Sequence, residues 1–471
     1  MEPLLFSNRD LRKLIAPMVV EQLLAVLVGL ADTIMVAAVG ESAVASVSLV
    51  DNINVLLIGL FMALATGGAV VAGQFLGHGD EGKATMAAEQ LLLFMMLFSV
   101  VIMTAVYGGK WFILHVVFGQ IEPEVMEYAD TYLMIVTGSI PFIAMYNGGA
   151  AIFRVQGNSA VSMGVSILMN GINVAGNAFL VLGLHWGVEG VALPTLASRI
   201  VAAFAMVCLL FHQKLKIHLS RRKKIRFDWA MIGRILRIGV PNGVENSMFQ
   251  LGKLVLLSLI STFGTVAITA NAVCNTVAAF AILPGQAIGM GLVTVVSQCV
   301  GAGDYGQVRY YTKKLMKCAI CAMGVTNLLV MAAVPLIAFA YRLSSETAAI
   351  ARQILMLHSI CAIVIWTFSF TLPNTLRAAN DVKFAMIVSL LSMWLCRIVM
   401  GIVFGAWLGF GVLGVWMAMI LDWCVRSAVF MVRYHRGKWE KHGGVLLKHL
   451  DRNSDYERRE DGKQAKEKSG E

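Results

Sequence analysis

The chain has 471 residues, of which 58% are hydrophobic and only 14% are charged. Soluble domains carry about 25% charged residues, so this composition excludes an ordinary water-soluble protein. The net charge of +10 does not require a nucleic acid partner. Lys and Arg collect in the cytoplasmic loops of membrane proteins and attract anionic lipid. We therefore expect an integral membrane protein that contacts membrane lipids and binds no nucleic acid.

Apolar segments of about 20 or more residues recur along the chain, and each can cross a hydrocarbon core about 30 Å thick. We predict an all-α integral membrane protein with twelve transmembrane helices. The predicted spans of the first half are 14–39, 47–74, 88–116, 130–153, 160–183 and 187–212. Those of the second half are 232–261, 266–298, 314–341, 349–373, 383–408 and 411–434.

The distribution of Lys and Arg predicts the orientation of these helices. An even number of spans places both termini on one side, and that side carries about 31 Lys and Arg against about three on the other. The larger count includes Arg154 and Arg377 as loop residues. We therefore expect a multi-pass protein of the cell (inner) membrane with both termini in the cytoplasm. The residues before the first span lack the pattern of a removable signal peptide.

The two halves of the sequence repeat each other at a shift of 224 residues. Matched pairs include Pro17 and Pro241, Glu21 and Glu245, Gln74 and Gln298, Gly77 and Gly301, Asp80 and Asp304 and, at a shift of 223, Arg154 and Arg377. Because six spans is an even number, both halves enter the membrane in the same direction. Such parallel repeats are typical of transporters, with the substrate path between the two lobes.

We divide the chain into a six-helix lobe at 1–212, a basic cytoplasmic linker at 213–230, a second six-helix lobe at 231–435 and a charged cytoplasmic tail at 436–471. The matched Gly-x-Gly-Asp-x-Gly segments at 77–82 and 301–306 lie in predicted cytoplasmic turns. No Lys-Ser/Thr follows them and no strand precedes them, so we interpret them as turns and not as phosphate-binding loops.

Ionisable side chains at membrane depth cost several kcal/mol and are functional candidates by default. The candidates are Glu21, Asp32, Asp51, Arg199, Glu245, Lys253, Arg397, Asp422 and Arg426. Asp422 and Arg426 are four residues apart and are predicted to neutralise each other. Asp51, Arg199 and Arg397 lie nearer the ends of spans, and we interpret them as structural.

Glu21 and Asp32 are eleven residues apart on the first predicted helix, which places them within about 20° of the same face. Pro17 removes a backbone hydrogen bond and can bend this helix. Two carboxylates on a bending helix suit a site that opens and closes. In the alternative interpretation, both are inert and hydrogen-bonded to neighbouring helices.

Asn173 and Asn177 share a face of the fifth span, and Thr195 follows on the sixth. With Asp32 they would supply hard oxygen ligands for sodium, or hold a carboxylate that takes up a proton. The alternative is a set of interhelical hydrogen bonds without function. We predict cation binding by these four residues, and no catalytic residue, no metal besides sodium and no cofactor besides the coupling ion. Glu21 and Glu245 are the predicted substrate or coupling carboxylates.

The sequence resembles the multidrug and toxic compound extrusion (MATE) family over residues 10–435. The similar segments are Val28-Gly-Leu-Ala-Asp32-Thr-Ile-Met-Val, Ala69-Val-Val-Ala-Gly-Gln74-Phe-Leu-Gly77, Gly187-Val-Glu-Gly-Val-Ala-Leu-Pro-Thr195 and Gly411-Val-Leu-Gly-Val-Trp416-Met-Ala. The resemblance implies a secondary active antiporter that exports organic, often cationic, drugs or toxic compounds by alternating access, in exchange for sodium ions or protons. It also implies an amino-terminal cation site at Asp32, with Asn173, Asn177 and Thr195 as its partners.

The chain departs from the family pattern in two places. Some members have an aspartate at the position of Asn177, so the choice of ion stays open. Many members have a glutamate eight or nine residues after the proline of the seventh helix, whereas Glu245 follows Pro241 by four. The repeat mate of Asp32 is Leu256. We therefore expect ion coupling in the first lobe.

A lipid-linked oligosaccharide flippase of the same fold is the alternative function. Such a protein needs basic groups in a central cavity to hold pyrophosphate, whereas the mid-helix charges of the first and seventh spans are acidic. A membrane enzyme is disfavoured because neither His-Glu-x-x-His nor Gly-x-Ser-x-Gly occurs. A receptor would not need the internal duplication. We predict a monomeric transporter that is not an enzyme and takes small organic, cationic substrates.

Overall fold

The computed structural model describes residues 4–119, 121–219 and 226–442. Every regular element within these residues is a helix. The first half contains α1 (Asn8–Ala37), α2 (Glu41–Gly77), α3 (Glu81–Gly108), α4 (Lys110–Phe112), α5 (Pro123–Thr137), α6 (Ile140–Val155), α7 (Ser159–Asn177) and α8 (Glu189–Leu210). The second half contains α9 (Trp229–Ser261), α10 (Thr265–Gly301), α11 (Tyr305–Ala340), α12 (Ser345–Cys361), α13 (Pro373–Ala378), α14 (Val382–Ser392), α15 (Met400–Ile402) and α16 (Gly411–His435). π-Helical segments at Ile113–Val117, Ala178–Gly183, Ala362–Thr371, Met393–Val399 and Val403–Trp407 extend or join these helices.

Ten helices in the described part of the chain are long and apolar enough to cross a membrane. An eleventh span results if α5 and α6, which are bent by 47° at their junction, cross as one. α9 has 33 residues but is not among the ten, and polar and ionisable side chains interrupt its sequence. The predicted all-α membrane fold is confirmed, while the count of twelve spans stays a prediction. Large apolar side chains such as Phe204, Leu329 and Phe339 are mostly exposed, as expected for helices that face lipid.

The first helix begins six residues before the predicted span. Ser7 and Asp10 form a capping box, in which the Ser7 hydroxyl accepts from the Asp10 N–H at 3.2 Å and the Asp10 carboxylate accepts from the Ser7 N–H at 2.9 Å. These bonds satisfy N–H groups that a helix start otherwise leaves free. The basic residues before the first apolar segment therefore belong to α1 itself.

The sequence repeat is also a repeat of structure. α2 and α10 each contain 37 residues, and their first residues are 224 apart. The turns that follow them are also alike. Gly79 and Gly303 have φ of 85° and 75°, which favours glycine, and Asp80 and Asp304 each cap the next helix with a 2.8 Å hydrogen bond. The Gly-x-Gly-Asp-x-Gly segments are helix-connecting turns, as predicted.

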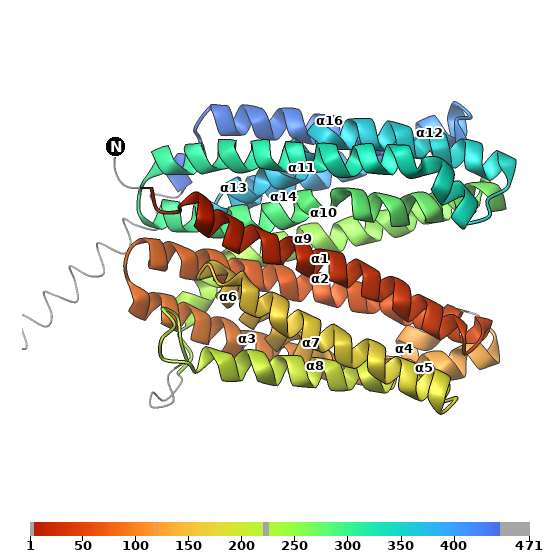
Figure 1. The fold of residues 1–471 in the computed structure, drawn as a ribbon, viewed down its shortest axis with the longest axis horizontal. Helices are drawn as coiled ribbons and strands as arrows, with labels where there is room; N and C mark the ends of the chain where they lie inside the picture. Colours follow the sequence, from red (N-terminus) through yellow and green to blue (C-terminus); the bar gives the residue numbers. More distant parts are fainter. Residues whose placement is uncertain (1–3, 120, 220–225, 443–471) are drawn as a thin grey trace, which may run out of the picture.

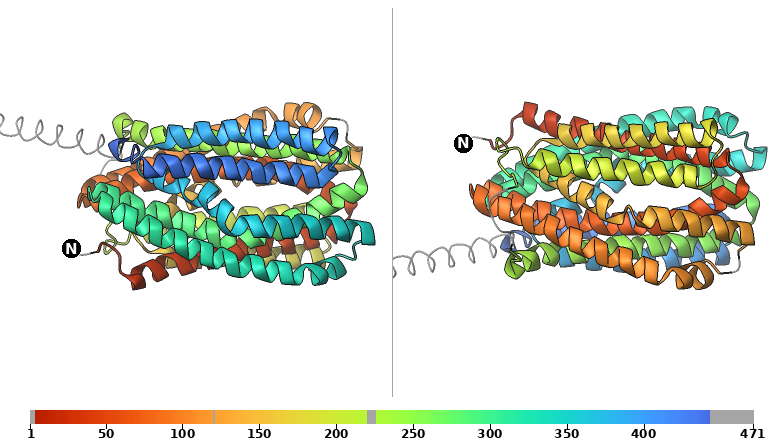
Figure 2. Two further views of the ribbon diagram at one scale, coloured as in Figure 1. Left: turned by 90° about the horizontal axis from the view of Figure 1, so that it is seen from above. Right: turned by 90° about the horizontal axis from the view of Figure 1, so that it is seen from below.

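The helices of the two halves form two bundles that lie side by side (Figure 1). Four helices make most of the contact between the bundles: α2 packs along α9 and α10, and α1 packs along α10. The start of α1 and the end of α16 lie at the same end of the molecule (Figures 1 and 2). We call this end, which also carries the α2–α3 and α10–α11 turns, the terminal face.

At the terminal face the last turns of α2 and α10 touch through their backbones. A Cβ atom on Gly77 would lie 1.9 Å from the Gln298 carbonyl oxygen, and one on Gly301 would lie 1.9 Å from the Gln74 carbonyl oxygen. Each glutamine side chain also donates to a backbone carbonyl of the opposite half, at 2.9 Å from Gln74 and 2.6 Å from Gln298. We call these four residues the latch. They close the two halves against each other at this face.

Most of the predicted basic linker run (220–225) and of the predicted tail (443–471) lies outside the described residues.

Candidate functional site

The four residues predicted to bind a cation lie together in the first half. Asp32 is near the end of α1, Asn173 and Asn177 are in the last turns of α7, and Thr195 is on α8. Asn177 Nδ2 donates to Asp32 Oδ1 at 2.8 Å. With its amide oriented so that both ends find partners, Asn173 donates to the Asp32 carboxylate at 2.9 and 3.2 Å and accepts from Thr195 Oγ1 at 3.0 Å.

This cluster contains a carboxylate, two amides and a hydroxyl within hydrogen-bond reach of one another. Both asparagines are buried, and Asn177 Oδ1 has no hydrogen-bond partner among the described residues. A carboxylate with amide and hydroxyl oxygens beside it offers the ligands that hard cations use. The same carboxylate can instead take up a proton. The donor set therefore fits either coupling ion.

Two further charged residues lie close to this cluster. Asp51 on α2 accepts hydrogen bonds from Asn54 at 3.2 Å and from the Tyr132 hydroxyl at 3.4 Å. Arg199 on α8 donates to Ser139 Oγ at 2.7 Å. Each side chain thus has a polar partner on another element or on its own helix, and a structural role stays the prediction for both.

Glu21 shares a helix with Asp32 but belongs to a separate, buried cluster. Its carboxylate accepts hydrogen bonds from Arg154 Nη2 at 2.5 Å, Ser162 Oγ at 3.1 Å and the Tyr146 hydroxyl at 3.2 Å. Arg154 comes from the last turn of α6, and Ser162 from α7. Glu21 is thus fully engaged with neighbouring helices in this conformation.

Glu245 has the same kind of partner in the second half. Arg377 Nη2 donates to both of its carboxylate oxygens, at 2.7 and 2.8 Å. Arg426 Nη2 lies 3.7 Å from the same carboxylate. The two carboxylates are 224 residues apart and their arginines are 223 apart, so the repeat carries one buried ion pair in each half.

The prediction that Arg154 and Arg377 are loop residues is wrong. Both side chains turn into the protein, with only 15% and 11% of their surface exposed, because each meets a buried carboxylate at matching depth. A signal was available in the sequence, since the acids and the arginines recur at almost the same shift.

Asp422 and Arg426 lie close enough to interact electrostatically, as predicted, but their direct ion-pair partners are other residues. Asp422 lies 4.0 Å from Arg397 and accepts a hydrogen bond from Ser392 Oγ at 2.5 Å, whereas Arg426 faces Glu245. A spacing of four residues permits contact on a helix, but a partner on another helix can be better placed.

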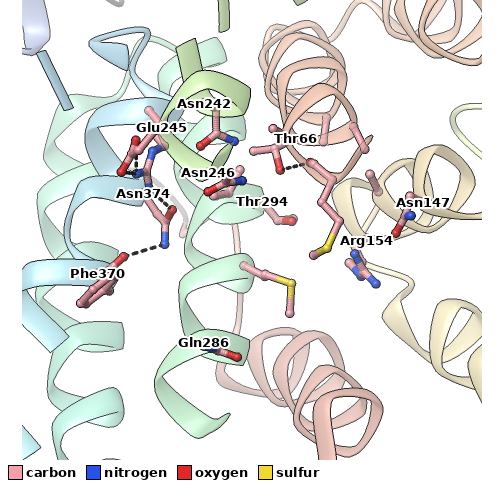
Figure 3. Close-up of a pocket in the computed structure, with 18 of the residues that line it drawn as sticks. Thr66, Asn147, Arg154, Asn242, Glu245, Asn246, Gln286, Thr294, Phe370 and Asn374 are labelled. Atoms are coloured by element: carbon pink, nitrogen blue, oxygen red, sulfur yellow. Dashed lines mark hydrogen bonds and ion pairs between the residues drawn. The ribbon is translucent and has the colours of Figure 1, made fainter. Parts of the chain in front are cut away.

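A cavity of about 390 Å³ lies between the two halves. Arg154 and Asn147 enter it from α6, and Asn242, Glu245 and Asn246 line it from α9 (Figure 3). The wall also includes Gln22, Met62, Thr66, Phe249, Gln286, Met290, Thr294, Trp366, Phe370, Asn374, Arg377 and Arg426, and several small apolar residues. This mixed wall suits an organic molecule with apolar and polar parts.

A second cavity, of about 420 Å³, lies further along α9. It is lined by Lys253 and Arg397, by Leu256 and Met419, and by polar side chains from α2 and α10. Neither cavity is lined by Asp32. The predicted cation site is therefore separate from both of these cavities in this conformation.

The sequence model of the MatE family matches residues 17–179 and again 241–403. The chain belongs to the MatE family. The two matches begin 224 residues apart, as the sequence repeat does. The resemblance to multidrug and toxic compound extrusion proteins is thereby confirmed.

Curated relatives and solved structures agree with this assignment. The chain is 27% identical to the uncharacterized transporter YisQ of Bacillus subtilis, over 91% of this chain and 94% of that protein. It is 26% identical to the probable multidrug resistance protein NorM of Thermotoga maritima, over 92% and 93%. A solved outward-facing conformation of a multidrug resistance MATE family transporter of the MOP superfamily has the same fold, with a TM-score of 0.85, 18% identity and coverage of 93% and 96%. The protein is a multi-pass membrane transporter.

Proposed function

We propose that the protein is a secondary active antiporter that exports small organic compounds, including drugs, in exchange for sodium ions or protons by alternating access. The observation that carries the proposal is the cluster of Asp32, Asn173, Asn177 and Thr195 inside the first half. The latch supports it, because a transporter of this kind must close the compound path at one face while the other is open.

Several features form part of the same proposal. The chain consists of lobes at 1–212 and 231–435, joined by the linker at 213–230 and followed by the tail at 436–471. The terminal face is cytoplasmic, so both termini are inside the cell. The protein works as a monomer and catalyses no reaction.

A flippase for lipid-linked oligosaccharides is not favoured by the comparisons, since relatives are named for multidrug resistance. The acidic residues Glu21 on α1 and Glu245 on α9 do not decide between a flippase and a drug exporter. Arg154 and Arg377 neutralise them.

The test uses purified protein in vesicles that contain an organic dye, with fluorescein and tetramethylrosamine tried in parallel. A sodium or proton gradient imposed across the membrane should drive dye movement, and Asp32→Asn should lower the gradient-driven rate at least about tenfold, equivalent to about 1.4 kcal/mol. Asp32 is the one ionisable member of the cluster. The asparagine amide that replaces it can neither offset the charge of a sodium ion nor take up a proton.

The matched control is Asp130→Asn, which removes a carboxylate of the first half that pairs at 2.8 Å with Lys110 in a half-exposed position. This variant should keep the wild-type rate. Unchanged coupling in Asp32→Asn would show that Asp32 is not the coupling residue. No gradient-driven movement of either dye would argue against the proposed transport.

A further inference from the structure

The walls of the two cavities carry more positive than negative charge. Five basic side chains line them, Arg154, Lys253, Arg377, Arg397 and Arg426, and the acidic lining residue among those described is Glu245. Arg377 already binds both oxygens of Glu245. Arg154 is paired with Glu21, and Arg397 lies 4.0 Å from Asp422. Lys253 has no ion pair in the described part of the chain, so the five basic side chains outnumber the three carboxylates beside them.

Arg426 is a buried arginine with unpaired N–H groups. Its side chain is 1% exposed, and its nearest carboxylate oxygen, on Glu245, is 3.7 Å away. Its Nε and Nη1 have no hydrogen-bond partner within the described ranges. Phe370 covers one face of the guanidinium, with the ring centroid 4.4 Å from Cζ. The N–H groups lie in the guanidinium plane, so they stay available for a bidentate acceptor such as a carboxylate or phosphate.

Three cations gather around the ring of Phe249, which lies on α9 between the two cavities. The distances to its centroid are 5.1 Å from Arg397, 5.6 Å from Lys253 and 5.8 Å from Arg426. Lys253 makes no ion pair within the described part of the chain. Cation–π contacts offset part of the cost of placing these charges together. A bound anion would offset more.

The internal repeat shows that the basic character of the second cavity has no counterpart at the matching positions of the first half. At the shift of 224, the cation cluster Asp32, Asn173, Asn177 and Thr195 corresponds to Leu256, Arg397, Gly401 and Met419. The corresponding residues also lie together, since a Cβ on Gly401 would be 3.2 Å from Leu256 and three of the four line the second cavity. Where the first half gathers oxygen ligands around a carboxylate, the second half presents an arginine.

We propose that the second half binds an organic anion, with its acidic group held by Arg426, Lys253 and Arg397 around Phe249 and its apolar part against Trp366 and Phe370. This inference rests on the proposed function, because it names the class of compound exported. It replaces the expectation of a cationic substrate. The occupant is a carboxylate, sulfonate or phosphate attached to an apolar body, and it can reach the cavity from water or from the membrane.

The test measures binding of two dyes that share a ring system and differ in charge. Fluorescein is an anion and tetramethylrosamine is a cation, so fluorescence polarisation with the purified full-length protein in neutral detergent compares charge at nearly constant shape. We expect fluorescein to bind at least about tenfold more tightly, and its affinity to fall as salt is added. Equal affinity, or tighter binding of tetramethylrosamine, would overturn the inference.

Two variants connect this preference to the residues. Lys253→Met removes a charge that has no ion-pair partner, and Arg426→Met leaves Glu245 paired with Arg377, so each leaves no carboxylate unpaired. Each should weaken fluorescein binding about tenfold and leave tetramethylrosamine binding unchanged or tighter. Arg309→Met, which removes an exposed arginine paired with Glu440, is the matched control and should change neither. Wild-type fluorescein affinity in both cavity variants would refute the assignment.

Competition identifies the source of the anion. Displacement of fluorescein by phosphatidylglycerol but not by phosphatidylcholine supports a lipid headgroup, and displacement by a soluble aryl phosphate alone supports a compound from water. Binding does not depend on transport, so the two proposals can fail separately. Fluorescein that binds through Arg426 but is not moved by any gradient contradicts the proposed function alone. Gradient-driven export of tetramethylrosamine without fluorescein binding contradicts this inference alone.

Discussion

Glu245→Gln is expected to destabilise the protein by about 3–5 kcal/mol, the usual cost of removing one partner of a buried ion pair. The substitution keeps the size of the side chain but takes the counter-ion from two arginines at once. Arg377 keeps at most one of its two hydrogen-bonded oxygens and loses the opposing charge, and Arg426 loses its nearest carboxylate. The measurement is the unfolding midpoint of the purified protein in detergent, followed by tryptophan fluorescence.

The internal repeat supplies a matched comparison. Glu21→Gln removes the equivalent carboxylate of the first half, which pairs with one arginine, Arg154. We expect a smaller loss there, because the neutral donors Tyr146 and Ser162 can still bond to the amide oxygen. The double variant Glu245→Gln with Arg377→Met should recover part of the lost stability. Equal losses in the two halves, or strict additivity in the double variant, would contradict the network described.

Gly77→Ala is expected to open the terminal face. The added methyl group would lie 1.9 Å from the carbonyl oxygen of Gln298, and a backbone atom cannot move aside as a flexible side chain can. The last turns of α2 and α10 must therefore separate by more than about 1 Å to reach ordinary contact. Spin labels on cysteines placed at the exposed positions Glu81 and Ala302, in a background without the exposed native cysteines, should report a longer and broader distance distribution.

Gly29→Ala and Gly233→Ala are the controls, because a Cβ at either helical position meets no atom within 4 Å. Both should keep the wild-type distance and gain a few tenths of a kcal/mol of stability from their helix propensity. Gly301→Ala should act like Gly77→Ala, since the contact is reciprocal. An unchanged distance in both latch variants would show that the terminal face does not depend on this approach.

The sequence predicted the parts of the structure that depend on local pattern. Apolar length located ten of the spans, and the 224-residue shift identified the two halves. The spacing of Asn173 and Asn177, four residues apart and thus on one face of α7, placed both where Asp32 meets them. Thr195, a polar residue on the following span, joins that cluster. Whether the cluster binds an ion stays a prediction.

The features that the sequence could not predict depend on contacts between helices. Arg154 looks like a loop residue because it follows an apolar segment, and its inward direction depends on Glu21, 133 residues away. The four-residue spacing pairs Asp422 with Arg426, whereas packing of the helices gives it a direct contact with Arg397 at 4.0 Å. In each case the deciding partner is distant in the chain.

The lengths of α2 and α10 place the latch outside the hydrocarbon core of the membrane. Each helix has 37 residues and is therefore about 55 Å long, against about 30 Å for the hydrocarbon core. Even a tilt of about 30° leaves roughly 18 Å to extend beyond the core. The latch occupies the final turn of both helices, so it lies at the level of the water and lipid headgroups beside the core, although the Gln74 side chain itself is buried. Each glutamine hydrogen bond of the latch then contributes only about 1 kcal/mol, not the several it would contribute in hydrocarbon. Separation of the two halves at the latch therefore costs about 2 kcal/mol in these two hydrogen bonds.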